Sequence, residues 1–294
     1  MALHRSRGEQ LFNLFNLSFM VLLGFATLYP FLYVVFASFS DAGLLLRHRG
    51  LLLRPLAPQF GAYAMVFANP VFFISYLNTV IYTSSGTALS VALTVFGAYS
   101  LSRKNVMFRT PIIFYIIFTM WFSGGMIPLF LLVRNVGLLN SRLALILPNA
   151  VSAWNLIVML TYFRTIPDSL EESAKMDGAN DYVIMFRIIV PLAIPVISVI
   201  TLFYAVGIWN SWFHAMIFLS NRRLFPVQLI LREILILNDT SAMMGGAVPQ
   251  GEQMQVGETI KYATAVVATV PILMLYPFVQ RYFVKGIMIG AIKG

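Results

Sequence analysis

Long stretches without a charged side chain alternate with short polar segments along this chain. No Asp, Glu, Lys or Arg occurs between Glu9 and Asp41 or between Arg54 and Arg103, and four further uncharged windows follow. A bilayer hydrocarbon core about 30 Å thick requires roughly 20 apolar residues of helix. The pattern therefore predicts an all-α integral membrane protein. The six expected spans are residues 13–37, 71–101, 110–133, 143–163, 189–219 and 262–280.

The segments between the windows carry turn and loop signals. Pro55, Pro58 and Pro70 interrupt the first third of the second window, so residues 42–70 are expected to form an extramembrane segment. Residues 238–258 combine Gly, Pro and polar side chains and are expected to form a flexible loop. The first window follows a basic N-terminus, but its uncharged run far exceeds the roughly 7–15 apolar residues of a signal peptide. We therefore expect it to be a transmembrane helix.

Two windows contain residues that either weaken a helix or let helices approach closely. Gly124, Gly125 and Pro128 lie in the middle of the third window. They predict a loosened hydrogen-bond ladder or, equally, a close helix contact. Asn78 and residues 84–86 (Ser-Ser-Gly) in the second window leave the same alternatives open, with helix packing favoured.

The composition supports a membrane protein and narrows its chemistry. Of the 294 residues, 59% are hydrophobic and 11% are charged, whereas soluble domains are about a quarter charged. The mean hydropathy is +0.82. A net charge of +9 could suit nucleic acid, but basic residues at span ends anchor and orient membrane proteins, so we expect no nucleic-acid partner. The chain has no cysteine, which excludes disulfides and thiol chemistry.

Acidic residues concentrate in one short segment, which carries its own helix signals. Ser169 and Glu172 have the spacing of a capping box after Pro167, which predicts Ser169 as the N-cap of a helix. Gly178 suits the position just beyond the helix, where a positive φ is common. Residues 168–181 contain five of the eleven acids, namely Asp168, Glu171, Glu172, Asp177 and Asp181.

The expected helix is only two to three turns long, too short and too charged to enter the membrane. Asp168, Glu171 and Glu172 lie at the positive end of the helix dipole, where each contributes about 0.3–1 kcal/mol when exposed. Leu170 and Ala174, continued by Asp177 or Gly178, form a small stripe at three-to-four spacing. Because so short a helix is marginal in water, it needs a surface to dock against.

The same segment resembles the signature loop of transmembrane subunits of bacterial ABC importers. That loop is written EAA, three residues, G, nine residues, I, one residue, LP. Here residues 172–174 (Glu-Ser-Ala) stand for EAA, Gly178 follows after three residues, and Ile188 and Val190-Pro191 complete the spacing. The departures, Ser173 for Ala and Val190 for Leu, are small and leave every offset intact.

Residues 121–148, 204–219 and 261–294 are also similar to the oligosaccharide-uptake branch of that family, so the likeness runs from about residue 11 to the end. It is closest to permeases for polysaccharides, including acidic ones such as alginate. The resemblance implies the type I ABC importer permease fold, with six transmembrane helices and a short cytoplasmic coupling helix between helices 4 and 5. The implied regions are a cytoplasmic N-terminus (1–10), a first helix with an external loop (11–70), a transmembrane core (71–283) with the coupling loop (165–188), and a cytoplasmic tail (284–294).

The resemblance further implies how energy reaches this chain. The coupling helix of the family inserts into a cleft on a cytoplasmic ATPase, so Glu172 would make a charged contact, Ala174 would allow close approach and Gly178 would permit the bend. No GxxxxGK[ST] phosphate loop occurs here, so ATP and Mg²⁺ would be held by the partner ATPase and this chain would be no enzyme and bind no cofactor. The implied coupling residues are Glu171, Glu172, Ala174, Asp177, Gly178 and Ala179.

The implied assembly places the chain in the bacterial cytoplasmic (inner) membrane as a multi-pass protein with both termini cytoplasmic. Its partners would be a cytoplasmic ATPase dimer, a homologous second permease subunit in a heterodimer, an extracytoplasmic sugar-binding protein and membrane lipid. Both the orientation and the partners follow from the family.

Candidate substrate contacts gather in the fifth window. Aromatic faces stack on sugars, while amide and imidazole groups hydrogen-bond to hydroxyls. The alternatives are an aromatic belt and a polar contact between helices, and an isolated histidine is more often an interface residue than a ligand. The candidate pathway residues are Tyr204, Trp209, Asn210, Trp212 and His214. An arginine cluster at Arg47, Arg49 and Arg54 could attract an anionic sugar, although a solvated loop is the favoured interpretation.

Two other classes of protein compete with an ABC permease. A secondary transporter or channel for small solutes would usually hold ionisable residues within its spans, and here His214 is the sole candidate. A membrane enzyme would need a constellation of paired carboxylates, clustered histidines or a nucleophile with its base, yet the three histidines are far apart in sequence. Neither class accounts for the spacing over residues 172–191.

Overall fold

The computed structural model describes residues 7–236 and 257–274, and every regular element in these two ranges is helical. Residues 7–70, 233–236 and 257–269 belong to one compact unit, and residues 71–232 with 270–274 belong to a second. The helices before the acidic segment are α1 (Arg7–Ser38), α2 (Ala42–Arg47), α3 (Gly61–Ala68), α4 (Pro70–Ser102), α5 (Arg109–Trp121), α6 (Met126–Asn135), α7 (Leu143–Ile146) and α8 (Ala153–Phe163). Those that follow are α9 (Asp168–Met176), α10 (Asp181–Ile184), the π-helix η1 (Met185–Ile189), α11 (Val190–Leu192), α12 (Ile194–Trp209), α13 (Phe213–Phe218), the 3₁₀-helix η2 (Arg222–Leu224) and α14 (Val227–Ile236), with a last helix over residues 257–274.

In the first unit, α1 is a long apolar helix with almost no buried surface, and its C-terminal end packs on the segment that follows. Ala37 shares a small core with Leu45 and Leu52, and the ring of Tyr33 meets that of Tyr262 edge-on at 5.9 Å. Residues 42–70 contain only the short helices α2 and α3, as expected for an extramembrane segment.

Two helices are long and apolar enough to cross a membrane without a break, and two bent pairs could each supply one more. The unbroken helices are residues 8–38 and α4. The bent pairs are α5 with α6 (114°) and residues 181–192 with α12 (83°). The 11-residue α8 is apolar but shorter than a span. These helices are counted within the described residues only, and the predicted number of six spans stays a prediction.

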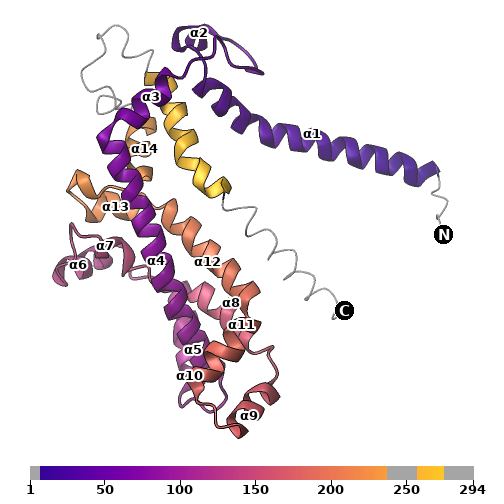
Figure 1. Ribbon diagram of the computed structural model, residues 1–294, viewed down its shortest axis with the longest axis vertical. Coiled ribbons are helices and arrows are strands. Elements are labelled where there is room, and N and C mark those ends of the chain that lie inside the picture. Colours follow the sequence, from indigo (N-terminus) through magenta and orange to yellow (C-terminus); the bar gives the residue numbers. More distant parts are fainter. Residues whose placement is uncertain (1–6, 237–256, 275–294) are drawn as a thin grey trace. The chain divides into compact units, whose positions relative to one another are not determined.

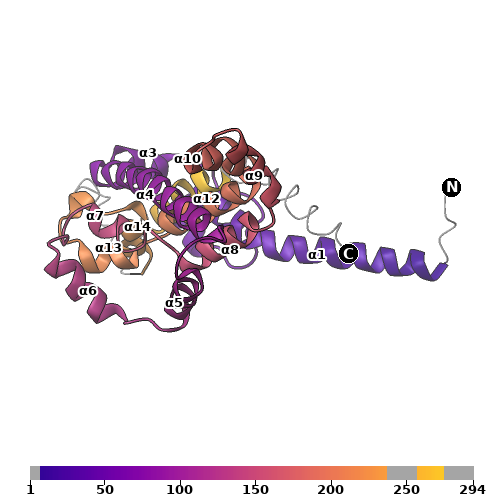
Figure 2. The same ribbon diagram turned by 90° about the horizontal axis from the view of Figure 1, so that it is seen from below.

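The span expected over residues 110–133 is interrupted, which agrees with the loosened hydrogen-bond ladder expected around Gly124, Gly125 and Pro128. The chain leaves the helix after Trp121 and re-enters it at Met126, and Figure 2 shows α5 and α6 diverging on either side of the connecting loop. Gly125 adopts φ +85°, which an L-residue rarely adopts, and a Cβ there would have nothing within 4 Å. Gly125 is therefore required for the break itself, and the alternative of close packing is wrong at this position.

The expected spans over 143–163 and 189–219 are also interrupted. α7 stops short of Pro148, and α8 begins only after Ser152, whose side chain accepts a hydrogen bond from the Asn155 amide. α12 ends at Trp209 before α13 restarts at Phe213. Hydropathy averaged over a window is insensitive to such breaks, because a few loop residues change the average of some 20 residues only slightly.

The second unit is organised around α4, which in Figure 1 extends from beside α13 to beside α9. Val95, Leu156 and Ile200 bring α4, α8 and α12 into one core. Gly86 allows a close approach, because a Cβ there would lie 2.9 Å from Ile208 Cδ1. The packing role favoured here is therefore confirmed for Gly86, whereas Ser84 and Ser85 are exposed.

Asn78 joins α4 to two other segments of the second unit, η2 with its C-cap and the residue before α7. Its Nδ2 donates to the carbonyl oxygens of Arg223 at 2.7 Å and Phe225 at 3.3 Å. Its Oδ1 accepts from Arg142 Nη2 at 3.1 Å. A buried amide with all these partners is a structural link between helices, as the packing interpretation predicted.

Candidate functional site

The acidic segment forms α9, a helix of nine residues with a glycine-terminated end. Gly178 has φ +80°. Its amide donates to the Lys175 carbonyl at 3.0 Å, and the Ala179 amide donates to the Ala174 carbonyl at 2.9 Å. These two bonds make a Schellman motif. The predicted role of Gly178 beyond the helix is therefore confirmed.

The predicted capping box at the start of α9 is wrong. The helix begins at Asp168, one residue before the expected N-cap, and Pro167 occupies the cap without a side-chain hydrogen bond. Ser169 thus lies inside the first turn, where its hydroxyl cannot serve as the cap. The carboxylate of Asp168 instead accepts from Lys104 Nζ at 2.5 Å, a contact across 64 residues that local sequence does not reveal.

The hydrogen bond from Lys104 lowers the pKa of Asp168 below its usual 3.8. A carboxyl whose pKa is lower in the folded state stabilises that state above its unfolded pKa, and the contribution is lost only as the pH falls through the folded value. The Asp168 carboxyl is therefore ionised at neutral pH. Because it is exposed, it adds little to stability.

The two neighbouring glutamates of α9 have different surroundings. The Glu171 side chain is nearly buried and forms ion pairs with Arg103 and, one helical turn away, with Lys175 at 2.7 Å. Glu172 is exposed and has no salt bridge within the part of the chain that the structure describes. Of the two glutamates, Glu172 is thus the one whose carboxylate is available to another molecule.

The remaining predicted coupling residues also differ in their exposure to solvent. Ala174 is buried in the core that α4 and α10 also contribute to, whereas Asp177 and Gly178 are exposed and Ala179 is half-buried. Leu170 remains 41% exposed, so Ala174 is the residue of the expected apolar stripe that is buried in the core.

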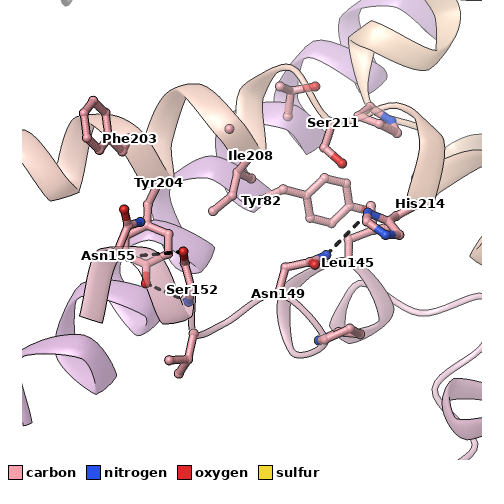
Figure 3. Close-up of a pocket in the computed structure, with 15 residues that line it drawn as sticks. Tyr82, Leu145, Asn149, Ser152, Asn155, Phe203, Tyr204, Ile208, Ser211 and His214 are labelled. Atoms are coloured by element: carbon pink, nitrogen blue, oxygen red, sulfur yellow. Dashed lines mark hydrogen bonds between the residues drawn. The ribbon is translucent and has the colours of Figure 1, made fainter. Parts of the chain in front are cut away.

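A cavity of about 440 Å³ lies between α4, α8, α12 and α13. Tyr204 is at its wall, where the phenol oxygen bonds to Thr94 Oγ1 at 2.8 Å and accepts from the Ser152 amide at 3.0 Å. Figure 3 shows the His214 ring on the opposite side, 3.4 Å from Asn149 Nδ2. Among the described residues, the lining mixes aromatic rings with neutral hydrogen-bonding groups and contains no Asp, Glu, Lys or Arg.

The structure brings together only two of the five predicted pathway residues. Tyr204 and His214 line the cavity, whereas the other three do not. Trp209 is buried edge-on against Tyr76 at 5.8 Å, and Asn210 is the exposed C-cap of α12. The Arg232 guanidinium lies 4.7 Å from the centre of the Trp212 ring, a cation–π contact.

The cavity and α9 lie beside different parts of the long helix α4. Tyr82 lines the cavity, while the Tyr99 hydroxyl donates to the Asp181 carbonyl just beyond α9 at 3.2 Å. At about 1.5 Å of rise per residue, these two tyrosines are about 25 Å apart along the helix.

The sequence pattern of one protein family, described as "Binding-protein-dependent transport system inner membrane component", matches residues 9–289. The chain belongs to this family. Its description as an inner membrane component agrees with the apolar helices of the structure.

Several relatives of this inner membrane component are named as permease proteins. The chain is 42% identical over 290 residues to the polygalacturonan/rhamnogalacturonan transport system permease protein YtcP of Bacillus subtilis, covering 97% of this chain and 99% of the relative. It is 39% identical to LplC of the same organism, covering 99% and 98%. Among solved structures it matches, with a TM-score of 0.86 and 35% identity, a chain of a bacterial ABC transporter involved in the import of the acidic polysaccharide alginate, covering 95% and 99%.

Several cavity residues of this inner membrane component were missed by sequence analysis. Tyr82, Asn149, Ser152, Asn155 and Ser211 all line the cavity. A signal was available for the two asparagines, because an amide within an apolar window requires a partner or a polar cavity. Both lie in the 143–163 window, and nothing in the local sequence shows that they line the same cavity as Tyr204.

Replacing Gly178 by Ala should weaken the end of α9 in this inner membrane component. A left-handed conformation costs an L-residue about 1–2 kcal/mol, so Gly178→Ala should increase hydrogen exchange at the Gly178 and Ala179 amides by roughly fivefold or more. Gly61→Ala is the control, since Gly61 has ordinary φ and nothing within 4 Å of a Cβ. Equal exchange in both variants would contradict the requirement for positive φ.

Proposed function

We propose that this chain is the transmembrane permease subunit of an ATP-driven importer that carries oligosaccharides or polysaccharides, including acidic ones such as alginate. The observation that carries the proposal is the full-length similarity to YtcP, which is named as a polysaccharide permease. The similarity to an importer of alginate supports the acidic class. The names of these relatives provide no support for the alternative of a secondary transporter or channel.

In this proposal α9 is the coupling helix, with Glu171, Glu172, Ala174, Asp177, Gly178 and Ala179 forming its coupling residues. ATP and Mg²⁺ belong to the partner ATPase, and this chain transmits movement. Supporting this, α9 is short and hydrophilic, and its Glu172 is exposed while Ala174 anchors the helix on the core. An exposed carboxylate on a helix held by its own unit is suited to a charged contact with a soluble partner.

The cavity beside Tyr204 is proposed as part of the sugar pathway. Its neutral hydrogen-bonding groups and aromatic rings suit hydroxyls and C–H faces, respectively. A lining without charge would hold a sugar weakly enough to let it pass. Trp209, Asn210 and Trp212 lie outside this lining and serve to test whether the pathway extends further along α12 and α13.

The proposed topology has six crossings with both termini in the cytoplasm, in a bacterial cytoplasmic membrane. The partners are an ATPase dimer, a homologous second permease subunit and an extracytoplasmic sugar-binding protein. The bent pairs α5–α6 and α10–α12 would each count as one crossing. The predicted loop over residues 238–258 lies outside the described residues except for its last two positions, and the sixth span is described only to residue 274.

The decisive experiment is purification of the tagged chain in mild detergent, followed by identification of the subunits that co-elute and a test of which saccharides stimulate ATP hydrolysis. We expect an ATPase, a second permease and stimulation by polysaccharide fragments in the presence of the binding protein. A chain that elutes without an ATPase, or an ATPase indifferent to every saccharide, would contradict the proposal.

Substitutions at the cavity should alter the response to sugar. Tyr204→Phe and His214→Ala each remove a polar group worth about 0.5–1.5 kcal/mol, so the saccharide concentration for half-maximal ATPase stimulation should change by roughly three- to tenfold. Asn210→Ala and Trp212→Ala, outside the lining, should change it less. If the second pair has the larger effect while subunit recovery is equal, the pathway does not pass through this cavity.

A further inference from the structure

Two ion pairs connect the end of α4 to α9, and they differ sharply in exposure. Arg103 pairs with Glu171, and these side chains are 16% and 13% exposed. Lys104 pairs with Asp168 at 2.5 Å, and these side chains are 76% and 54% exposed. Because solvent screens exposed charges, the Arg103–Glu171 pair is the one able to hold the two helices in a defined geometry.

Arg103 is fixed on the last turn of α4 by several contacts. Its guanidinium lies 5.1 Å from the centre of the Tyr99 ring, and its Nε donates to Ser102 Oγ at 2.9 Å. Ser102 Oγ in turn donates to the Tyr99 carbonyl at 2.7 Å. The planar guanidinium is therefore already oriented by α4 before it meets the carboxylate of Glu171.

Glu171 is equally fixed on α9. Its Oε2 faces Arg103, while its Oε1 accepts from Lys175 Nζ at 2.7 Å. One turn along the helix, Ala174 packs into the same core as Tyr99. Both carboxylate oxygens of Glu171 are thus occupied by cations of its own chain, whereas the adjacent Glu172 remains exposed.

We infer that Glu171 and Arg103 are positioning residues that transmit the displacement of α9 to α4, while the contact with the ATPase belongs to Glu172. This inference rests on the proposed function of α9 as the coupling helix. α4 contains no proline beyond its first residue, so it lacks the commonest cause of a helix kink. A displacement at Arg103 is passed along α4 to Thr79 and Tyr82, which line the cavity.

The test compares Glu171→Gln with Asp168→Asn in the assembled importer. Both variants replace one carboxylate on α9 by an amide of nearly the same shape, but only the first breaks the nearly buried pair. Coupling between sites is typically 1–3 kcal/mol, so Glu171→Gln should lower sugar transported per ATP hydrolysed on the order of tenfold, with ATPase recovery unchanged. Asp168→Asn should change this ratio less than about twofold.

A double-mutant cycle separates this pair from its surroundings. If Arg103 acts through Glu171, the double variant Arg103→Gln/Glu171→Gln should lose no more coupling than either single variant. Losses that multiply would mean that the two residues act independently, which would overturn the inference.

A distance measurement supplies a readout that does not depend on activity. The chain has no cysteine, so spin labels can be placed at Ser100→Cys on α4 and Met176→Cys on α9, both at exposed positions. The distance distribution should be narrow in the otherwise unchanged chain and in Asp168→Asn, and broader in Glu171→Gln. An equally narrow distribution in all three would overturn the positioning role.

The outcomes distinguish this inference from the proposed function. If Glu171→Gln loses the ATPase as a Glu172 variant is expected to, Glu171 is a contact residue and the inference fails while the coupling helix stands. If Glu171→Gln behaves like Asp168→Asn, the Arg103–Glu171 pair does not transmit the displacement of α9 to α4. If Glu172→Lys retains full transport, the proposed coupling role of α9 itself fails.

Discussion

Glu172→Lys is expected to abolish sugar uptake and to weaken recovery of the ATPase with the membrane complex. Glu172 is exposed, so its replacement should change the stability of the isolated chain by less than about 0.5 kcal/mol. At an interface, reversing a buried charge contact costs about 2–5 kcal/mol, which corresponds to at least roughly thirtyfold weaker association. Uptake by whole cells and co-purification of the ATPase measure the two effects.

Met107→Lys is the matched control for this prediction. Met107 is 73% exposed and lies in the connection between α4 and α5, close in sequence to the cations that pair with α9. The Met107→Lys variant also introduces a lysine near this part of the second unit, and it leaves Glu172 unchanged. Full uptake by Glu172→Lys, or equal losses in both variants, would refute a specific coupling contact at Glu172.

Gly207→Trp is expected to close the cavity and to lower uptake by more than about tenfold, equivalent to about 1.4 kcal/mol or more of lost transport competence. Gly207 lines the cavity, and nothing lies within 4 Å of a Cβ placed there. The first carbon of a larger side chain therefore meets no neighbour, and the rest of the indole would extend into the cavity. Assembly with the ATPase should be normal, because α9 lies about 25 Å away along α4.

Two further variants make this result interpretable. Gly207→Ala adds one methyl group at the same position and should cause a smaller loss than the tryptophan. Gly61→Trp makes the same replacement at a glycine of α3 with equally open surroundings, and it should transport normally. If Gly207→Trp imports sugar as well as Gly61→Trp does, the cavity is not part of the route.

The residues that sequence analysis located correctly act through their own short segment. Gly178 ends α9 because a positive φ is needed there, and Gly125 supplies a positive φ at the N-cap of α6. Such preferences belong to the residue itself and need no distant partner. The failure at Ser169 and the full break within the 110–133 window concern helix ends, where a neighbouring contact or a single dihedral angle outweighs the average polarity of the segment.

The amino-acid sequence by itself determined the apolar windows, the short acidic helix and the family spacing, because hydropathy and fixed offsets are properties of consecutive residues. Only the tertiary structure decided which side chains meet. Arg103 and Glu171 are 68 residues apart, and Tyr204 reaches Thr94 and Ser152 from another helix. Those contacts depend on how helices pack and cross, so the exposed Glu172, the paired Glu171 and the wall of the cavity became distinguishable only once the chain was folded.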